Sequence, residues 1–253
     1  LSRHPAARRL DDGGGEGAVL TRIITVAETG STNADLLDLA ASGAGEGLWL
    51  RAERQLAGRG RQGRPWASPE GNLYASTLVR LRPGDPPAAS LALVAAVALE
   101  EVVAKLVPRG TMLKWPNDLL VAGAKLSGIL LERVGDAVVI GIGVNVAHHP
   151  DLPDRPATSL AAQGAAITPG ELLDRLAEML AAWLAIWRGQ GLGPVVARWI
   201  ERAHPVGTAL HARLADGSAL DGEFETMAAD GALVLRLADG SSRVIHAGDV
   251  FLV

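Results

Sequence analysis

The stretch that decides the fold is residues 111–146, TMLKWPNDLLVAGAKLSGILLERVGDAVVIGIGVNV. It is rich in leucine and β-branched residues, and Pro116 and a glycine-containing turn interrupt it. Proline cannot donate a ladder hydrogen bond, so it divides strands rather than continuing them. The pattern therefore predicts two short strands divided at Pro116, a longer strand after the glycine turn, and a further strand over residues 137–146.

The segments on either side of this stretch alternate between strand and helix patterns. Strands are predicted over residues 22–29, 47–55 and 72–81. Ser31 and Thr32 stand in N-cap positions before a helical leucine pattern, and residues 88–106 have apolar residues at helical spacing. Residues 171–191 form a strongly amphipathic pattern that ends in glycine, and a shorter helix follows it. The chain is thus expected to be α+β.

The pattern of apolar and polar residues changes after Pro205. Apolar and polar residues alternate, and Asp-Gly pairs recur at 216–217, 230–231 and 239–240. Asp-Gly is a strong hairpin signal, because glycine readily adopts positive φ. We predict a small β-barrel over residues 204–253, a catalytic domain over 19–203 and a flexible leader over 1–18.

Composition limits the classes of function. The 253 residues have a formal net charge of −4 and no cysteine, so disulfides and thiolate chemistry are excluded. Mild acidity argues against non-specific capture of nucleic acid, which needs a broad basic face. No apolar run is long enough for a membrane span, and the N-terminus lacks the apolar core of a signal peptide. We therefore expect a cytoplasmic protein that binds neither membrane nor DNA.

The segment GRGRQGRPW, residues 58–66, is the first candidate site. Its G-x-G-x-x-G does not open a helix, as a dinucleotide-binding fold requires, and it lacks the lysine of a P-loop. It also lacks the helix pair around the G-x-x-G loop of a KH module. A cradle for a small anion remains, with Arg59 and Arg61 converging from an extended segment; the alternative is a solvated arginine-rich turn.

The second candidate site is the motif KWPND, residues 114–118, together with the lysine that lies eleven residues after Lys114. The chain has only three lysines, and Lys114 and Lys125 flank this motif. One interpretation is an Asn-Asp turn with two solvated lysines. The other places Asp118 to bind Mg²⁺ or orient a base, and Lys125 to neutralise a phosphate, while Gly128 permits close approach of the backbone.

Together with GSTNADL and GIGVNV, these motifs make the chain resemble the biotin protein ligases. The resemblance implies a mixed sheet with flanking helices, related to the class II aminoacyl-tRNA synthetases, followed by an SH3-like barrel. It also implies ATP- and Mg²⁺-dependent activation of biotin to biotinyl-5′-AMP. Biotin is then transferred to a lysine of a biotin carboxyl carrier protein or domain, which is the expected partner. A monomer and a homodimer are both compatible with the sequence.

The resemblance also implies roles for individual residues. Lys125, Arg61 and Arg59 would be catalytic, with Lys125 bridging the biotin carboxylate and the α-phosphate. Ser31, Thr32, Asn33 and Gln55 would address biotin. The further expected contacts are Gly58, Gly60, Trp66, Lys114, Asn117, Asp118, Gly128, Gly141, Gly143 and Asn145, with Asp118 at the metal. The arginine loop and residues 148–158 would cover the adenylate, a mixed anhydride that water hydrolyses.

Two departures and two rival functions accompany this interpretation. Ser127 stands where the family usually has alanine or glycine, and too few residues precede the first strand for the DNA-binding domain of many bacterial relatives. A lipoate or octanoyl ligase or transferase shares the catalytic fold, and an RNA-binding module could use the arginine loop. His148 and His149 lack the spacing of a zinc site, so we expect loop histidines there.

Overall fold

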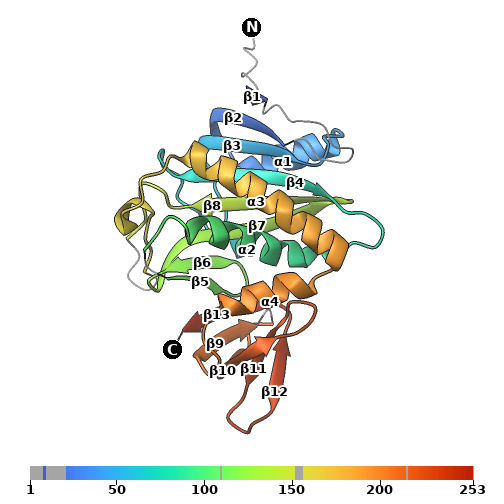
Figure 1. The fold of residues 1–253 in the computed structure, drawn as a ribbon, viewed down its shortest axis with the longest axis vertical. Coiled ribbons are helices and arrows are strands. Elements are labelled where there is room, and N and C mark those ends of the chain that lie inside the picture. The colour runs from blue at the N-terminus through green and yellow to red at the C-terminus, as the bar shows by residue number, and fades with distance from the viewer. Residues whose placement is uncertain (1–7, 10–20, 109, 152–155, 215, 253) are drawn as a thin grey trace.

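The computed structural model describes residues 8–9, 21–108, 110–151, 156–214 and 216–252, and its centre is an eight-stranded sheet (Figure 1). The strand order is β1-β2-β3-β4-β8-β7-β6-β5. The bounds are β1 Arg8–Arg9, β2 Arg22–Thr29, β3 Leu48–Gln55, β4 Leu73–Arg80, β5 Thr111–Lys114, β6 Asp118–Val121, β7 Ala124–Val134 and β8 Ala137–Val144. Only β2 and β3 pair in parallel, so the sheet is mixed.

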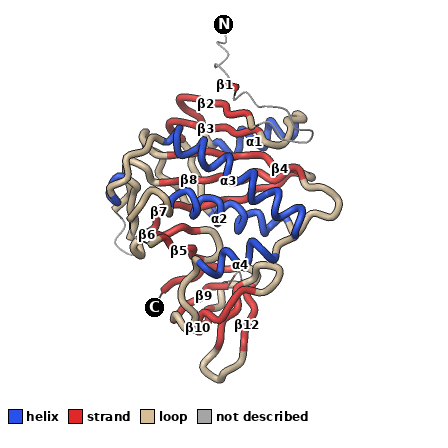
Figure 2. Tube along the Cα trace, viewed as in Figure 1, coloured by secondary structure: helices blue, strands red, loops and turns tan. Residues whose placement is uncertain are grey.

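Helices cover both faces of this sheet (Figures 1 and 2). Helix α1, Thr32–Ala41, connects the parallel strands β2 and β3 and packs against one face. Helices α2, Leu91–Val103, and α3, Pro169–Gln190, pack on the other face. Strand β8 serves both sides, because alternate residues of a strand point to opposite faces. Ile140 and Ile142 join the core beneath α2 and α3, whereas Val139 joins the core beneath α1.

The C-terminal part is a five-stranded antiparallel sheet, reached through α4, Gly193–Glu201. The strands are β9 Ala209–Leu214, β10 Ala219–Met227, β11 Leu233–Arg236, β12 Ser242–Ile245 and β13 Gly248–Leu252, in the order β12-β11-β10-β9-β13. The glycine of each Asp-Gly pair has positive φ, as the turns require. The predicted α+β fold, a mixed sheet followed by a β-module, is confirmed.

The junction between the large sheet with its helices and the C-terminal part holds polar contacts. Glu100 of α2 is completely buried and forms ion pairs with Arg198 of α4, at 3.2 Å, and with Arg202, at 3.4 Å. The indole Nε1 of Trp115 donates to the carbonyl of Gly231 in the C-terminal sheet, at 3.2 Å. Burial lowers the pKa of His204 at this junction to about 4, with a smaller contribution from the Lys114 charge.

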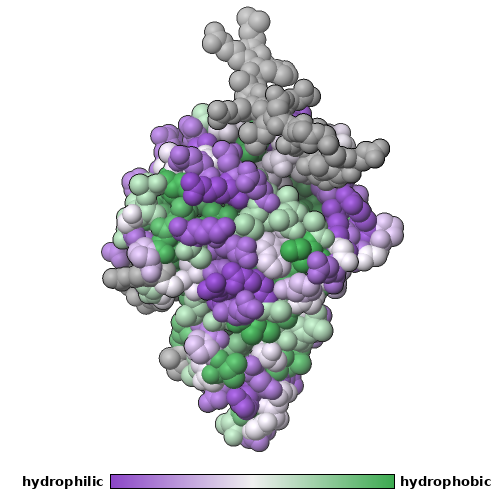
Figure 3. All heavy atoms as spheres, viewed as in Figure 1, coloured by the Kyte–Doolittle hydropathy of each residue, from purple (hydrophilic) through white to green (hydrophobic). Residues whose placement is uncertain are grey.

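The predicted domain limits fall as follows on the described chain. Of the predicted leader, residues 1–18, only β1 is described, and it pairs with β2; residues 1–7 and 10–18 lie outside the described residues. The predicted boundary near residue 204 lies between α4 and β9. Among the described helices, none is both long and apolar enough to cross a membrane. On the face shown in Figure 3, strongly polar side chains cluster across the middle of the molecule.

Candidate active site

The floor of the candidate site is a patch of sheet without side chains, on the face that α1 covers. Gly143 of β8 pairs with Gly128 of β7, and Gly141 of β8 pairs with Ser76 of β4. Directly paired residues point to the same face, and so do residues two positions apart along one strand. The three glycines therefore lie together in the middle of the sheet, where backbone atoms alone form the surface.

Two side chains from elsewhere in the chain lie directly on this floor. A Cβ atom added to Gly143 would lie 2.8 Å from the Trp66 ring, and one added to Gly141 would lie 2.2 Å from Asn33 Oδ1. Trp66 also approaches Gly128, where a Cβ would lie 3.3 Å from its ring. The approaches at Gly143 and Gly141 are closer than a side chain would allow, and the approach at Gly128 is tight. Glycine is therefore required at 141 and 143 by the seating of Asn33 and Trp66.

A buried polar network starts at the beginning of α1. Gln55 Oε1 accepts hydrogen bonds from the backbone N–H of Thr32, at 2.8 Å, and from the Thr32 hydroxyl, at 3.1 Å. The Thr32 and Ser76 hydroxyls are 2.7 Å apart, and Ser76 donates to Asn33 Oδ1 at 2.6 Å. Asn33 in turn donates to Glu132 at 2.7 Å. Such a connected network fixes rotamers, and it holds polar groups in place for a ligand.

The predicted N-cap differs in one respect. Ser31 occupies the N-cap position of α1 and is buried, but its side chain makes no capping hydrogen bond. A serine at this position normally gives its oxygen to a backbone N–H of the first turn. Here Gln55, the last residue of β3, supplies the oxygen that Thr32 N–H binds. The Ser31 hydroxyl therefore does not cap the helix.

Lys125 lies at the other side of the floor. Its Nζ donates to Asp118 Oδ1 at 2.6 Å and lies 5.5 Å from the centroid of the Trp66 ring. The buried Nε1 of Trp66 has no hydrogen-bond partner among the described residues. An unpaired buried donor costs free energy, so its presence is explained if a ligand acceptor completes it. A positive charge and an unused donor here suit an anionic ligand.

The arginine loop departs from the predicted extended conformation. Residues Arg61–Gly63 form a 3-10 turn, in which Gln62 has a φ of 56°. The Arg61 guanidinium turns toward the C-terminal sheet, where it donates to the Gly248 carbonyl, at 3.1 Å, and to Asp249, at 3.2 Å. Arg64 also pairs with Asp249. The expected convergence of Arg59 and Arg61 is therefore not observed, because a carboxylate of the barrel binds Arg61.

The other residues of the loop have distinct environments. Arg59 is exposed, and its side chain makes no hydrogen bond or ion pair with a described residue, so its guanidinium is accessible. Gly58 is buried, and a Cβ there would lie 2.6 Å from Ser68 Oγ and 2.7 Å from the Trp66 carbonyl. Ser68 also accepts a hydrogen bond from Gln55 Nε2 at 3.2 Å. The loop is thereby anchored at its base. Gly60 donates its N–H to Arg64 across the turn.

The two lysines that flank KWPND lie in different places. Lys114 Nζ lies 5.4 Å from the centroid of the Phe251 ring in β13, whereas Lys125 binds Asp118. Asn117 donates from its side-chain amide to the carbonyl of Ile129 at 2.7 Å, which ties the corner of the motif to β7. Lys114 and Asn117 thus hold elements together in this structure, and their predicted ligand contacts stay predictions.

Asn145 directly follows β8, and its side chain contacts the backbone of Lys125. Its Nδ2 donates to the carbonyl of Thr158, at 3.0 Å, and to that of Lys125, at 3.4 Å. The backbone of Lys125 also pairs with the chain around Ala157. The predicted covering loop, residues 148–158, therefore ends beside Lys125; its residues 152–155 lie outside the described part.

The comparisons with known proteins agree with this arrangement. The model of the "Biotin/lipoate A/B protein ligase family" matches residues 28–145, and that of the "Biotin protein ligase C terminal domain" matches residues 210–253. A biotin--[acetyl-CoA-carboxylase] ligase of Paracoccus denitrificans is 39% identical over 89% of this chain and 98% of its own length. The chain belongs to the biotin protein ligase family.

Further relatives support the assignment. A biotin--[acetyl-CoA-carboxylase] ligase of Mycobacterium tuberculosis is 39% identical over 93% of this chain and 91% of its own length. The solved structure of an Aquifex aeolicus biotin protein ligase, in complex with biotin and ATP, has a TM-score of 0.81. It is 26% identical and covers 91% of this chain and 98% of its own. Both parts of the fold are thus those of a biotin protein ligase.

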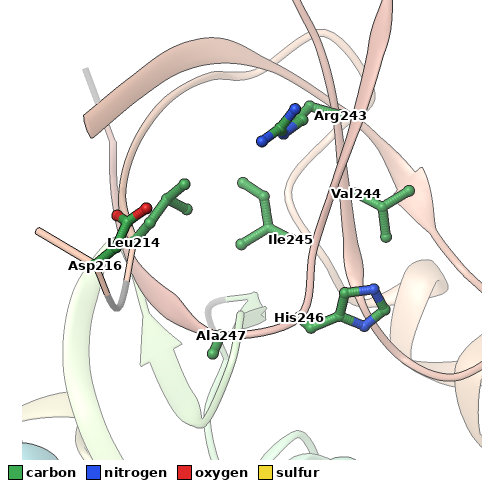
Figure 4. A pocket seen from close by; sticks show the side chains of 7 residues that line it. All are labelled: Leu214, Asp216, Arg243, Val244, Ile245, His246 and Ala247. Atoms are coloured by element: carbon green, nitrogen blue, oxygen red, sulfur yellow. The ribbon is translucent and has the colours of Figure 1, made fainter. Parts of the chain in front are cut away.

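Several residues of this candidate site were not predicted from the sequence. They are Ser68, Ser76, Glu132 and Asp249. Ser76 had a weak signal, since it is a polar residue in the middle of the mostly apolar strand LYASTLVR; the structure shows it completely buried. None of the predicted site residues lines the pocket of about 250 Å³ on the barrel, which Leu214, Asp216 and residues 243–247 form (Figure 4).

Proposed function

We propose that this chain activates biotin with ATP and transfers the biotinyl group to a lysine of a biotin carboxyl carrier domain. The relatives are named as ligases of this kind. The observation that carries the proposal is the arrangement above the glycine floor. There, Lys125 and the unpaired Nε1 of Trp66 lie at one end of the floor, by Gly128 and Gly143, and the Thr32–Gln55–Ser76 network lies at the other, by Gly141. The floor is thus flanked by a cation at one end and by neutral polar groups at the other.

In the first step, a biotin carboxylate oxygen attacks the α-phosphorus of ATP. A phosphorus–oxygen bond forms, the bond between the α-phosphorus and the bridging oxygen breaks, and pyrophosphate leaves with its electron pair. Negative charges must approach one another, so fixed cations stabilise the transition state. We assign this role to Lys125, which Asp118 orients, and to the exposed guanidinium of Arg59.

In the second step, the neutral amine of the acceptor lysine attacks the carbonyl carbon of the biotinyl-adenylate. A carbon–nitrogen bond forms, AMP leaves with the electrons of the carbon–oxygen bond, and the amine loses a proton to solvent. The arginine loop must keep the adenylate from water until the carrier domain arrives. Arg61 and Arg64 contribute by fixing the loop on the barrel.

Mg²⁺ is expected to accompany ATP. This ion is commonly held by one or two carboxylates together with the phosphates of the substrate. In the described part of the chain, no three or more acidic or histidine side chains gather into a metal site. Asp118 fits the role of a single carboxylate ligand at the phosphate end, beside Lys125. Bound there, Mg²⁺ would neutralise charge on the phosphates.

Biotin-dependent exchange of labelled pyrophosphate into ATP tests the first step. We expect exchange with biotin and none with lipoate or octanoate, which separates this function from that of the lipoate ligases of the same fold. Transfer is tested with a carrier domain and its lysine-to-arginine variant as the control, and only the former should gain biotin. Exchange with lipoate but not with biotin would contradict the proposal.

A further inference from the structure

The turn after β8 is built around one buried side chain, that of Asn72. This residue directly precedes β4 and is only 3% exposed. Its Oδ1 accepts hydrogen bonds from three consecutive backbone N–H groups: Val146 at 2.9 Å, Ala147 at 2.9 Å and His148 at 3.0 Å. Its Nδ2 donates to the His148 carbonyl at 3.0 Å. One side chain thus satisfies four backbone groups of another segment.

Three consecutive N–H groups that converge on one point form a concave site that normally binds an anion or another strong acceptor. Without such an acceptor, the N–H groups of Val146 and His148 would lack partners, because β8 ends at Val144 and its ladder does not reach them; the N–H of Ala147 also donates to the Gly71 carbonyl at 3.2 Å. Leaving buried backbone donors unpaired is costly. Asn72 therefore determines the path of the chain from residue 146 to residue 148.

Hydrogen bonds connect this turn to Lys125 through Asn145. The residue before the turn, Asn145, accepts from Leu160 N–H at 2.9 Å and donates to the carbonyls of Thr158 and Lys125. The backbone of Lys125 accepts from Thr158 N–H at 3.0 Å and donates to the Pro156 carbonyl at 2.8 Å. Lys125 is thus held in position between β6 and the returning chain, and Asn145 links that chain to the turn.

We propose that Asn72 is a positioning residue for the ATP end of the site, acting through the 146–148 turn and Asn145 on the placement of Lys125. The proposal rests on the role assigned above to Lys125. It does not extend to the biotin end, because Thr32 and Gln55 are held from α1 and β3. Loss of the Asn72 acceptor should therefore weaken the use of ATP more than that of biotin.

The test compares Asn72→Ser and Asn72→Asp in the full chain. A serine hydroxyl is too short to reach three amides, whereas an aspartate keeps the acceptor for the three amides and replaces the bond to the His148 carbonyl with a contact between two acceptor oxygens. We expect the KM for ATP in pyrophosphate exchange to rise about tenfold in the serine variant. It should take an intermediate value in the aspartate variant, while the KM for biotin changes less than about twofold in both.

Hydrogen exchange at residues 146–148 gives a readout that does not depend on activity. These amides should exchange faster in Asn72→Ser than in Asn72→Asp, even if the chain catalyses no exchange of pyrophosphate. That result would keep the turn assignment and remove the proposed function. Equal increases in the KM values for ATP and biotin, or an aspartate variant no better than the serine variant, would overturn the positioning role.

Discussion

At the scale of single residues, Lys125 and Trp66 lie on the same surface but differ in whether their polar groups are paired. Lys125 supplies charge and is already paired with Asp118, so its rotamer is set before any ligand binds. Trp66 supplies a wall that fits the glycine floor, together with a donor that no described residue accepts. The first arrangement favours the folded state, whereas the second has a cost that only a ligand recovers.

Lys125→Ala should retain the fold and lose most adenylate formation. The side chain is partly exposed and packs little, so its removal takes away charge rather than core volume. Loss of a single donor that stabilises a transition state commonly lowers kcat by about 10²-fold or more. Single-turnover formation of adenylate measures this loss, and Lys105→Ala, at an exposed lysine just after α2, is the control. A normal rate would assign Lys125 to the surface.

Trp66→Phe should weaken ligand binding without lowering stability. Phenylalanine keeps an aromatic wall and removes the unpaired Nε1. We therefore expect biotin to bind about tenfold more weakly by calorimetry, and the thermal midpoint to stay level or rise. Trp187→Phe is the matched control, because that indole donates to Ser90 at 2.8 Å and its loss should lower the midpoint. A drop in stability for Trp66→Phe as large as for Trp187→Phe would contradict this account.

At the scale of elements, the arginine loop is attached to the C-terminal sheet as well as to the sheet beneath it. Asp249 of β13 receives both Arg61 and Arg64, and its side chain is only 18% exposed. An ion pair that is partly shielded from water is worth more than an exposed one. The C-terminal sheet therefore contributes directly to the order of a loop that belongs to the catalytic part.

Asp249→Asn should make the loop a better substrate for trypsin. The protease can cleave after Arg59 and Arg61, whereas Pro65 protects the bond after Arg64. We expect cleavage at these two sites to speed up several-fold in the variant, because the amide is a weaker partner for two guanidinium groups. Asp221→Asn, which changes an exposed aspartate of the same barrel, should leave the rate unchanged. Equal rates in all three proteins would exclude the anchoring role.

The sequence predicted the strands, helices and Asp-Gly turns well, because each depends on spacing within a few residues. It predicted the glycines at 141 and 143 only through resemblance, whereas Gly128 was already indicated by the segment after KWPND. It could not predict that Arg61 binds Asp249, since the two are 188 residues apart and no local pattern links them. For the same reason, the partners of Asn33 at Ser76 and Glu132 appear only when β4 and β7 come together around β8.

At the scale of the whole molecule, the two sheets meet at a junction that holds a buried neutral imidazole. His204 is 5% exposed, and its Nε2 has no hydrogen-bond partner among the described residues. Burial, with a smaller contribution from the nearby Lys114 charge, lowers its pKa from 6.5 to about 4. The folded protein thus binds a proton at this site less readily than the unfolded chain does.

Stability should therefore fall in acid over a defined window. Well above pH 6.5 the imidazole is neutral in both states, and its contribution to stability is constant. As the pH falls toward 4, the unfolded chain gains a proton first, and the free energy of unfolding decreases by about 2 kcal/mol from this group. Denaturant unfolding between pH 7 and 4 measures the slope. His204→Gln should flatten it, whereas His246→Gln, at an exposed histidine, should not.

The glycine floor limits how the pocket can be re-engineered. Positions 141 and 143 already carry the smallest residue, so no substitution there can enlarge the space above them for bulkier acyl groups. Any added side chain would instead displace Asn33 or Trp66. Space for a larger analogue must come from the walls, by trimming Trp66 or the residues that support it. A variant library should therefore keep β8 fixed and diversify residues 66–68, where smaller side chains can make room for a larger acyl group.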